Sequence, residues 1–549
     1  MLKVYRIKMK LTSKKKMASK GEGIRESVAY FEELVTYGYL FCMLGIFPLH
    51  YVEGYSKIGN VKYEFFRNTS LAFIGISLIF AVIKVVLQKI RVQEERKAEQ
   101  ILFRDRFSFL DKAVLSYALC VIISYLLSPY KEFAFKGAAG WEMGFVAQMI
   151  FVFLYFIISR NANYGYFTLG IHLTASFITY ILGILHRFEV DPLGMYEGLN
   201  LNQKVEFLST IGQATWFSSY VCTGVAVGIV VFYISNAKWI RRLTGIYSIV
   251  GFGILVTQNS DSAFIAIAGM LLVLGYFSLQ DKKRWGRFWE IVSLMWGTFA
   301  GIGLLQRIFS DRAIPLDSLS IFFSQSYVIW IFLVISLGML YFCKKQENEK
   351  FLCITAKVYK GMLGIVVIGI FAMIIFIYLN TKGYLLEWFG YQSTHNYLLF
   401  NEQWGSHRGS TWMNVWKGIK EMSFLQLLFG VGPDSLSPYI YSIPEVSEAL
   451  QNLWGNVKLT NAHNEYLNSF VCYGMVGLIS WLTVLAGGVR YFYGKAKGKG
   501  YMIAFALCIA GYACHNIFCY QQVCCTPFLF IALGIGESLT KSENFNTIK

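Results

Sequence analysis

Long apolar runs recur along the whole chain and are separated by mostly short polar segments. Most runs hold about 18–22 residues, enough for an α-helix to cross a hydrocarbon core about 30 Å thick. Fourteen of them lie near residues 32–49, 69–88, 112–128, 142–159, 164–185, 213–235, 239–257, 262–279, 288–305, 321–342, 358–379, 465–489, 501–518 and 524–539. The pattern therefore predicts an all-α protein, a polytopic bundle of about fourteen transmembrane helices.

The composition agrees with this prediction. Only 15% of the 549 residues are charged, whereas a soluble protein carries about 25%. The mean hydropathy is +0.47, and 17% of the residues are aromatic, as expected where Trp and Tyr line both membrane interfaces. A net charge of +17 in a soluble chain would suggest nucleic acid. Aromatic-and-basic RNA motifs and a continuous basic helix are absent from the sequence, so we expect no nucleic-acid partner.

Lysine and arginine are distributed unevenly between alternate polar segments. With the N-terminus placed inside, the inner segments hold well over half of the 50 Lys and Arg, and among the outer segments the longest loop holds more cations than any other. Because cytoplasmic loops collect Lys and Arg, both termini are predicted to be cytoplasmic. The Lys-rich first thirty residues lack the apolar core and cleavage site of a signal peptide, so we expect a disordered cytoplasmic tail there.

Spans and loops divide the chain into five predicted parts. These are a basic cytoplasmic tail over 1–30, spans 1–11 within 31–379, an extracytoplasmic loop over 380–464, spans 12–14 within 465–539, and a cytoplasmic tail over 540–549. A loop as long as the third part is improbable in a compact protein unless it is functional. We therefore expect the chemistry of the protein to lie there.

The large loop contains two segments with the periodicity of amphipathic helices. Apolar residues that share one helical face are Trp412, Val415, Trp416, Ile419 and Met422 in the first segment, and Val446, Ala449, Leu450 and Leu453 in the second. Pro444 precedes the second set and Gly455 follows it, as at a helix start and end. We predict two short helices on the outer membrane surface. The five Trp of this loop either anchor it at the interface or stack against sugar rings.

Eleven cysteines are present, and most lie inside apolar runs, where Cys behaves as a small hydrophobe. The sequence has no C-x-x-C pair, which argues against a zinc or redox site. Cys519, Cys524 and Cys525 flank a short outer turn. They could form a disulfide there, although free thiols are favoured.

His463 and Asn464 stand where the span after the large loop begins. A helix N-terminus presents unpaired N–H groups and about half a positive charge, which favours an anion such as a diphosphate. A histidine with its ordinary pKa near 6.5 can take a proton from an acceptor hydroxyl. The alternative is that both residues merely cap the helix.

Two further motifs precede His463 in the loop. Arg408 stands at the start of the first amphipathic helix, and Arg is the residue suited to bidentate contact with phosphate. The other motif, Gly430-Val431-Gly432-Pro433-Asp434, permits a tight backbone turn. The plain alternatives are a solvated surface charge and a simple connection between helices. The outer loops contain no D-x-D or adjacent carboxylate pair, so no metal site is expected.

Taken in order, the three motifs resemble the O-antigen ligase and polymerase superfamily. The matching residues are Arg408 with Trp412, the turn at Gly430, Gly432 and Asp434, and Ala462-His463-Asn464-Glu465-Tyr466-Leu467. Segment 473–478 is also similar to the family, and segments 137–144 and 212–216 are similar to it more weakly. The resemblance implies a GT-C-like, metal-independent and cofactor-free glycosyltransferase in the bacterial cytoplasmic membrane.

The resemblance also implies partners and roles. The donor would be a glycan on undecaprenyl diphosphate, and the acceptor another glycan, a lipid, a wall polymer or a protein, at the outer face of the membrane. His463 would activate the acceptor hydroxyl and Arg408 would bind the diphosphate. Trp412, Gly430, Gly432, Asp434, Asn464, Glu465 and Tyr466 would contribute to substrate binding.

The chain departs from the family pattern at one outer turn. Many ligases carry a second Arg in an S-R-G-A-like turn, and the similar segment here is Asn259-Ser260-Asp261-Ser262-Ala263. Asp261 cannot bind a phosphate directly, so Arg187 or Arg312 is a candidate substitute.

Two other functions compete with a transferase. A lipid-linked oligosaccharide flippase also reaches fourteen spans, but it would keep its key charges within the spans and show two related halves. The spans here are nearly free of charge and no half-repeat is visible. An inert relative is the third possibility, because of Asp261.

Overall fold

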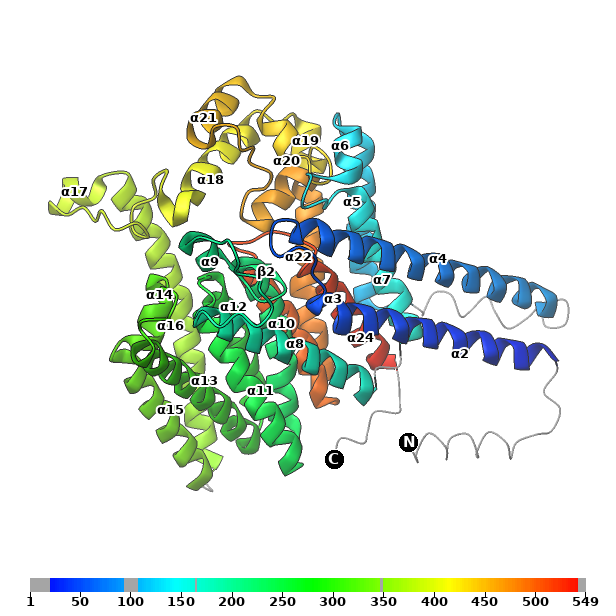
Figure 1. Ribbon diagram of the computed structural model, residues 1–549, viewed down its shortest axis with the longest axis horizontal. Helices are drawn as coiled ribbons and strands as arrows, with labels where there is room; N and C mark the ends of the chain where they lie inside the picture. Colours follow the sequence, from blue (N-terminus) through cyan, green and yellow to red (C-terminus); the bar gives the residue numbers. More distant parts are fainter. Residues whose placement is uncertain (1–19, 93–106, 163–164, 346–348, 542–549) are drawn as a thin grey trace.

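The computed structural model describes residues 20–92, 107–162, 165–345 and 349–541, and most of them are helical (Figure 1). The helices on the predicted spans are α2 (Lys20–Phe41) continued by the π-helix η1 (Cys42–Ile46) and α3 (Phe47–Leu49), α4 (Ile58–Val92), α5 (Phe109–Leu127), α7 (Phe145–Asn161), α8 (Tyr166–Arg187), α10 (Ala214–Ile234), α11 (Lys238–Thr257), α12 (Ser262–Ser278), α13 (Lys282–Ile308), α15 (Val328–Lys345), α16 (Glu349–Thr381), α22 (Glu465–Ala496), α23 (Ile503–His515) and α24 (Thr526–Lys541). Shorter elements are α6 (Lys131–Lys136), α9 (Leu201–Glu206), α14 (Ser318–Gln325), the 3-10 helix η2 (Gly500–Met502) and the antiparallel strands β1 (Phe207–Leu208) and β2 (Gly212–Gln213).

The fold is an all-α bundle of a multi-pass membrane protein, as predicted. Within the described residues, nine helices are long and apolar enough to cross a membrane, and three more apolar helices are shorter. Each of the fourteen predicted spans falls on helical residues. The number of fourteen crossings stays a prediction.

Two predicted boundaries are wrong. The span expected over 321–342 is interrupted between α14 and α15, at Ser326 and Tyr327. The Arg307 guanidinium holds this break by donating to the Gln325 carbonyl (2.5 Å). The N-terminal tail expected to be disordered over 1–30 is helical from Lys20 onward, while residues 1–19 and 542–549 lie outside the described part.

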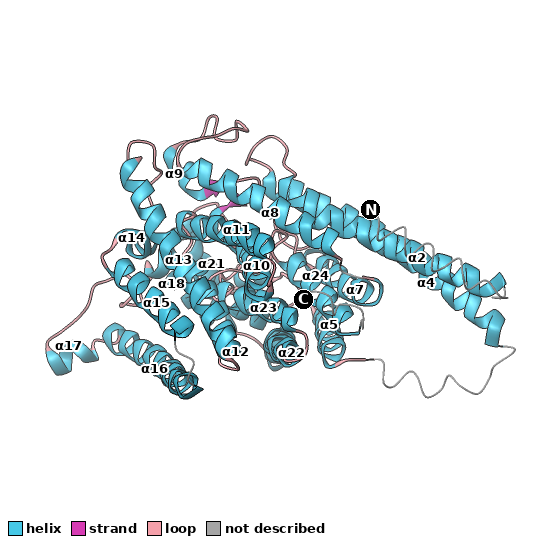
Figure 2. Cartoon of the chain, turned by 90° about the horizontal axis from the view of Figure 1, so that it is seen from below, coloured by secondary structure: helices cyan, strands magenta, loops and turns pink. Residues whose placement is uncertain are grey.

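The large loop folds into five short helices at one end of the bundle, at the top of Figure 1. They are α17 (Tyr384–Phe389), α18 (Trp404–Lys420), α19 (Phe424–Phe429), α20 (Leu436–Ile440) and α21 (Pro444–Trp454). Both predicted amphipathic helices are confirmed, as α18 and α21. We call this end the loop end. The opposite end, formed by the connections 235–238, 279–282 and 497–499, is called the basic end, and Figure 2 views the chain from that side.

A kink in α22 docks the loop onto the bundle. Gly474 has a φ of +69°, and a Cβ there would lie 2.3 Å from the Leu428 backbone. The N–H groups of Val431 and Gly432 donate to the carbonyls of Val471 (3.0 Å) and Cys472 (3.1 Å). Only glycine permits so close an approach of two backbones at this φ. The G-x-G turn is therefore joined to α22 by its main chain.

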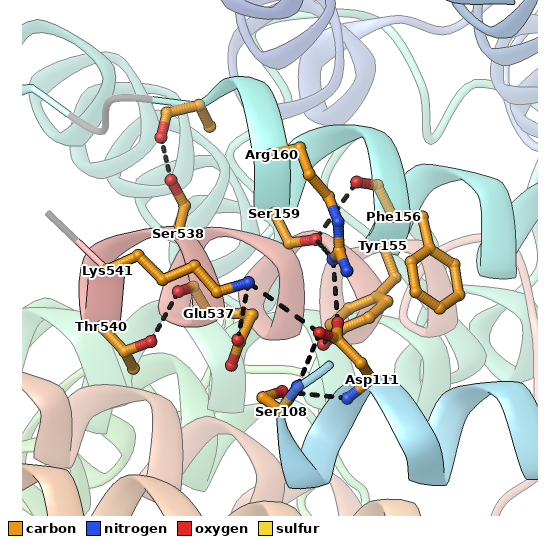
Figure 3. Close-up of polar contacts among 11 residues, drawn as sticks. Ser108, Asp111, Tyr155, Phe156, Ser159, Arg160, Glu537, Ser538, Thr540 and Lys541 are labelled. Carbon is orange, nitrogen blue, oxygen red and sulfur yellow. Dashed lines mark hydrogen bonds and ion pairs between the residues drawn. The ribbon is translucent and has the colours of Figure 1, made fainter. Parts of the chain in front are cut away.

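At the basic end, charged side chains connect α5, α7 and α24 (Figure 3). The fully buried carboxylate of Asp111 accepts hydrogen bonds from Tyr155 Oη (2.7 Å) and Arg160 Nη1 (2.8 Å). Lys541 Nζ lies 3.9 Å from Asp111 and 3.0 Å from the buried carboxylate of Glu537. Because a buried charge is stable only when it is paired, this cluster fixes α24 against the α5–α7 pair.

Candidate active site

A left-handed turn positions Arg408 at the start of α18. Gly405, Ser406 and His407 have φ values of 57°, 58° and 68°, so right-handed helix begins only after them. Arg408 Nη1 donates to the Gly405 carbonyl across this turn (2.9 Å). Its Nε is buried and has no hydrogen-bond partner in the described part of the chain. The guanidinium thus keeps donor capacity for an oxygen ligand.

Phe518 and Trp412 form the apolar wall beside Arg408. The Arg408 guanidinium lies 5.8 Å from the Phe518 ring, and Trp412 stacks on that ring with a centroid distance of 6.0 Å. Trp412 Nε1 also donates to the Ala462 carbonyl (3.0 Å). This bond ties α18 to the segment before α22, so Trp412 brings Arg408 close to His463.

His463 immediately precedes α22 in a left-handed conformation, with a φ of +48°. Its backbone N–H donates to Asn461 Oδ1 (3.0 Å), and the next residue, Asn464, caps α22 by accepting from the Leu467 N–H (2.8 Å). The half-buried imidazole meets the edge of the Tyr520 ring at 5.3 Å. The capping expected of this pair therefore belongs to Asn464, and the His463 side chain is left for other contacts.

Burial, followed by the positive charge of Arg408, lowers the pKa of His463 to about 4. Burial also lowers the pKa of Arg408, while nearby groups that include Asp261 oppose that shift. At neutral pH the site thus pairs a cationic guanidinium with a neutral imidazole. An anion binder beside a proton acceptor is the pair that transfer from a diphosphate to a hydroxyl requires.

Asp261 lies within electrostatic reach of Arg408. Tyr397 Oη donates to Asp261 Oδ2 (2.8 Å), and Asp261 Oδ1 is buried without a partner among the described residues. Burial and the neighbouring Asp317 raise the pKa of Asp261, and Arg408 lowers it. The turn that departs from the family pattern is thus part of the site, with an acidic group where a cation was expected.

Asp434 and Glu465 line a small pocket next to His463, together with Trp141 and Tyr520. Asp434 Oδ2 accepts from the N–H groups of Ala138 (2.7 Å) and Met143 (3.2 Å). Burial raises the Asp434 pKa to about 7, and these two hydrogen bonds oppose the shift. Asp434 therefore fixes the 137–144 segment beside the site.

Glu465 is buried at the first position of α22. Its carboxylate accepts from Tyr512 Oη (3.2 Å) and from Asn516 Nδ2, and its backbone N–H donates to the Asn516 carbonyl (3.0 Å). Tyr466 next to it donates to the Ala513 carbonyl (2.6 Å). Both residues join α22 to α23.

Other predicted substrate-binding residues lie away from open space. A Cβ at Gly430 would lie 2.2 Å from the Cys472 backbone, and one at Gly432 would lie 2.3 Å from Ser128 Oγ. The fully buried Arg187 donates to the carbonyls of Lys204 (2.7 Å), Val205 (2.9 Å) and Gln258 (2.8 Å). Among the described residues, Arg187 makes no hydrogen bond or ion pair with Arg408 or His463. Its guanidinium supports the backbone below the loop end.

Sequence reasoning missed the α23–α24 connection and the role of two weakly matching segments. Phe518 and Tyr520 come from that connection, which we considered only for its cysteines. Trp141 and Trp216 lie in the segments 137–144 and 212–216, and both rings meet Tyr520: Trp141 at 5.1 Å between centroids, and Trp216 through its Nε1 at 3.5 Å from Tyr520 Oη. An aromatic, amide-rich sequence in a short outer turn was the available signal.

Cys519, Cys524 and Cys525 are buried free thiols. Within the described residues, no group of three or more His, Cys, Asp or Glu side chains could hold a metal ion.

A comparison with protein families matches residues 313–482 to the family described as O-Antigen ligase. The matched segment contains Arg408, the G-x-G turn, His463 and the kink of α22. No curated protein matches the chain.

Proposed function

We propose, from the premise that the chain is a member of the O-antigen ligase superfamily, that it moves a glycan from undecaprenyl diphosphate to an acceptor. The reaction would take place at the outer face of the bacterial cytoplasmic membrane, with ligase or polymerase activity in cell-surface polysaccharide biosynthesis. The single observation that carries the proposal is the pairing of Arg408 with His463 at the loop end. The basic residues at the other end support an outer location for this site.

In the proposed reaction the Arg408 guanidinium binds the diphosphate of the donor, and its buried Nε supplies one of the donated hydrogen bonds. His463 accepts the proton of the acceptor hydroxyl. That oxygen then forms a bond to the anomeric carbon while the bond from this carbon to the diphosphate breaks. The electron pair leaves with undecaprenyl diphosphate, and Arg408 stabilises the charge that develops there. A single displacement of this kind inverts the anomeric centre.

The pKa of His463 couples donor binding to base strength. A pKa of about 4 makes a weak base in the empty site, and part of its lowering comes from Arg408. A bound diphosphate offsets that positive charge and so raises the His463 pKa toward neutrality. The imidazole is therefore a stronger base when the donor is present than in the empty site.

Arg408 and the N-terminus of α22 supply positive charge beside the diphosphate. We therefore propose that transfer needs no metal ion. Transfer in washed membranes treated with EDTA should equal that in untreated membranes. A loss that Mg²⁺ or Mn²⁺ restores would contradict this part of the proposal.

The decisive test uses membranes from a strain that lacks the gene, complemented with wild type or His463→Ala. We expect lipid-linked glycan to accumulate on the outer leaflet and acceptor glycan to disappear in the variant. His395→Gln, at an exposed histidine of the same loop, is the matched control and should transfer normally. Equal transfer by His463→Ala at equal abundance would refute the assignment. Accumulation on the inner leaflet would instead identify a flippase.

A further inference from the structure

A cavity of about 630 Å³ lies between α8, α10, α11, α23 and α24, and its lining includes none of the residues placed at the active site. It opens toward the basic end. Tyr166 begins α8, Trp239 is the second residue of α11, Tyr501 precedes α23, and Leu539 lies near the end of α24; all four line the cavity. Figure 2 views the bundle from this end and shows α8, α10, α11, α23 and α24 next to one another.

The cavity is unsuited to water. Its lining is mostly aliphatic and aromatic, for example Leu169, Val227 and Ile531. A water molecule needs two to four polar partners, and large apolar cavities stay dry or take up apolar guests. In a membrane protein the surrounding apolar phase is lipid hydrocarbon, so a lipid chain is the occupant with access.

One polar group inside the cavity needs a hydrogen-bond partner, which a hydrocarbon chain does not supply. His172 on α8 lines the cavity, and its buried Nδ1 has no hydrogen-bond partner among the described residues. His172 follows Tyr166 by six residues, which places it about 9 Å deeper along the helix at 1.5 Å per residue. A glycerol ester carbonyl could accept a hydrogen bond from this imidazole.

Two cations lie on α11 next to the lining residue Trp239. Lys238 and Arg242 are exposed on either side of Trp239, whose side chain is itself 66% exposed. Neither cation has an ion-pair partner in the described part of the chain, whereas Arg241 between them pairs with Glu290 (2.6 Å). Basic residues at a cleft between transmembrane helices attract anionic headgroups.

We infer that this cavity binds one acyl chain of an anionic glycerophospholipid from the leaflet at the basic end. The headgroup lies on Lys238 and Arg242, with Trp239 at the interface, and an ester group faces His172. The site is separate from the donor site and does not depend on the proposed transfer activity.

The test uses the full-length protein, purified in detergent, incubated with phosphatidylglycerol or phosphatidylcholine and examined by native mass spectrometry. Wild type should retain one phosphatidylglycerol, in about tenfold preference to phosphatidylcholine. Val231→Trp fills the cavity from α10 and should lose this lipid. Val366→Trp, on the exposed surface of α16, is the matched control and should retain it.

A surface variant keeps the test decisive if Val231→Trp fails to fold. Lys238→Gln/Arg242→Gln leaves the lining intact and should retain both lipids equally, having lost the preference for phosphatidylglycerol. Equal retention of the two lipids by wild type would overturn the inference. So would displacement of phosphatidylglycerol by an equimolar amount of undecaprenyl phosphate, which would make the cavity a polyprenyl site. Loss of glycan transfer has no bearing on this result, so the two proposals fail independently.

Discussion

The positive charge of Arg408 acts on the imidazole of His463, although α18 to α21 separate the two residues in the sequence. Burial and this charge together hold the His463 pKa at about 4. Trp412 makes the arrangement possible, because it stacks on Phe518 beside Arg408 and donates to the carbonyl of Ala462. The site is therefore one electrostatic unit, and each member can be tested through the other.

Removing the charge of Arg408 should change both the rate and its pH dependence. His463 must be neutral to accept a proton, so kcat/KM falls as the pH drops through its pKa. In Arg408→Gln we expect transfer to fall about 10- to 100-fold, because charged hydrogen bonds are lost. We also expect the acidic limb of the pH–rate profile, where kcat/KM falls as His463 is protonated, to move to higher pH.

Two companion variants separate charge from geometry at that position. Arg408→Lys keeps the charge, so the acidic limb should stay at the wild-type pH. Its transfer rate should be lower than that of wild type. Lys417→Gln, at an exposed cation of the same helix, should match wild type. An acidic limb at the same pH in Arg408→Gln and wild type would show that the Arg408 charge does not act on His463.

Gly474→Ala should disrupt the contact between the loop and α22. The added Cβ meets the Leu428 backbone at 2.3 Å, and the φ of +69° is strained for alanine. We expect destabilisation by more than about 1 kcal/mol, measured as a lower midpoint of thermal unfolding in detergent. Gly494→Ala, where the Cβ meets nothing within 4 Å in the same helix, should be neutral or slightly stabilising. Equal midpoints for the two variants would contradict the proposed docking contact.

Asp434 should make the protein less stable as the pH rises toward neutrality. Burial raises its folded-state pKa to about 7, above the ordinary value of 3.8. Between about pH 4 and pH 7 the folded chain holds a proton that the unfolded chain releases, so stability falls through this window. Asp434→Asn removes this dependence. Melting curves at pH 5 and pH 7.5 should show the variant gaining on wild type at the higher pH, and a constant difference would argue against a raised pKa.

Asp111→Ala should destabilise the basic end. The substitution leaves Arg160 and Lys541 without their shared buried carboxylate. Breaking a buried pair costs about 3–5 kcal/mol, and we expect the lower value because both cations are partly exposed. Lys57→Ala, which breaks the exposed pair with Glu53, should cost at most about 1 kcal/mol. Comparable losses of thermal stability in the two variants would argue that the charged cluster does not stabilise the packing of α24.

Local sequence patterns determined most of the helices. Apolar runs located the helical spans, and the spacing of Trp412, Val415 and Ile419 located α18, because hydrophobic periodicity reports directly which face is buried. The same reasoning joined 321–342 into one span, since it cannot detect a break that a side chain from another helix, Arg307, holds in place.

Residue type in context also identified Arg408 and His463, but only the tertiary structure decided what surrounds them. Phe518 and Tyr520 come from the α23–α24 connection, Trp141 from the connection before α7 and Asp261 from the connection before α12, and only the fold brings these three connections to the loop. The fold likewise buried Arg187 against three backbone carbonyls and used Gly430 and Gly432 for close backbone contact. Sequence fixes which groups are available, whereas long-range packing sets their distances and burial, and these two quantities control charge and pKa.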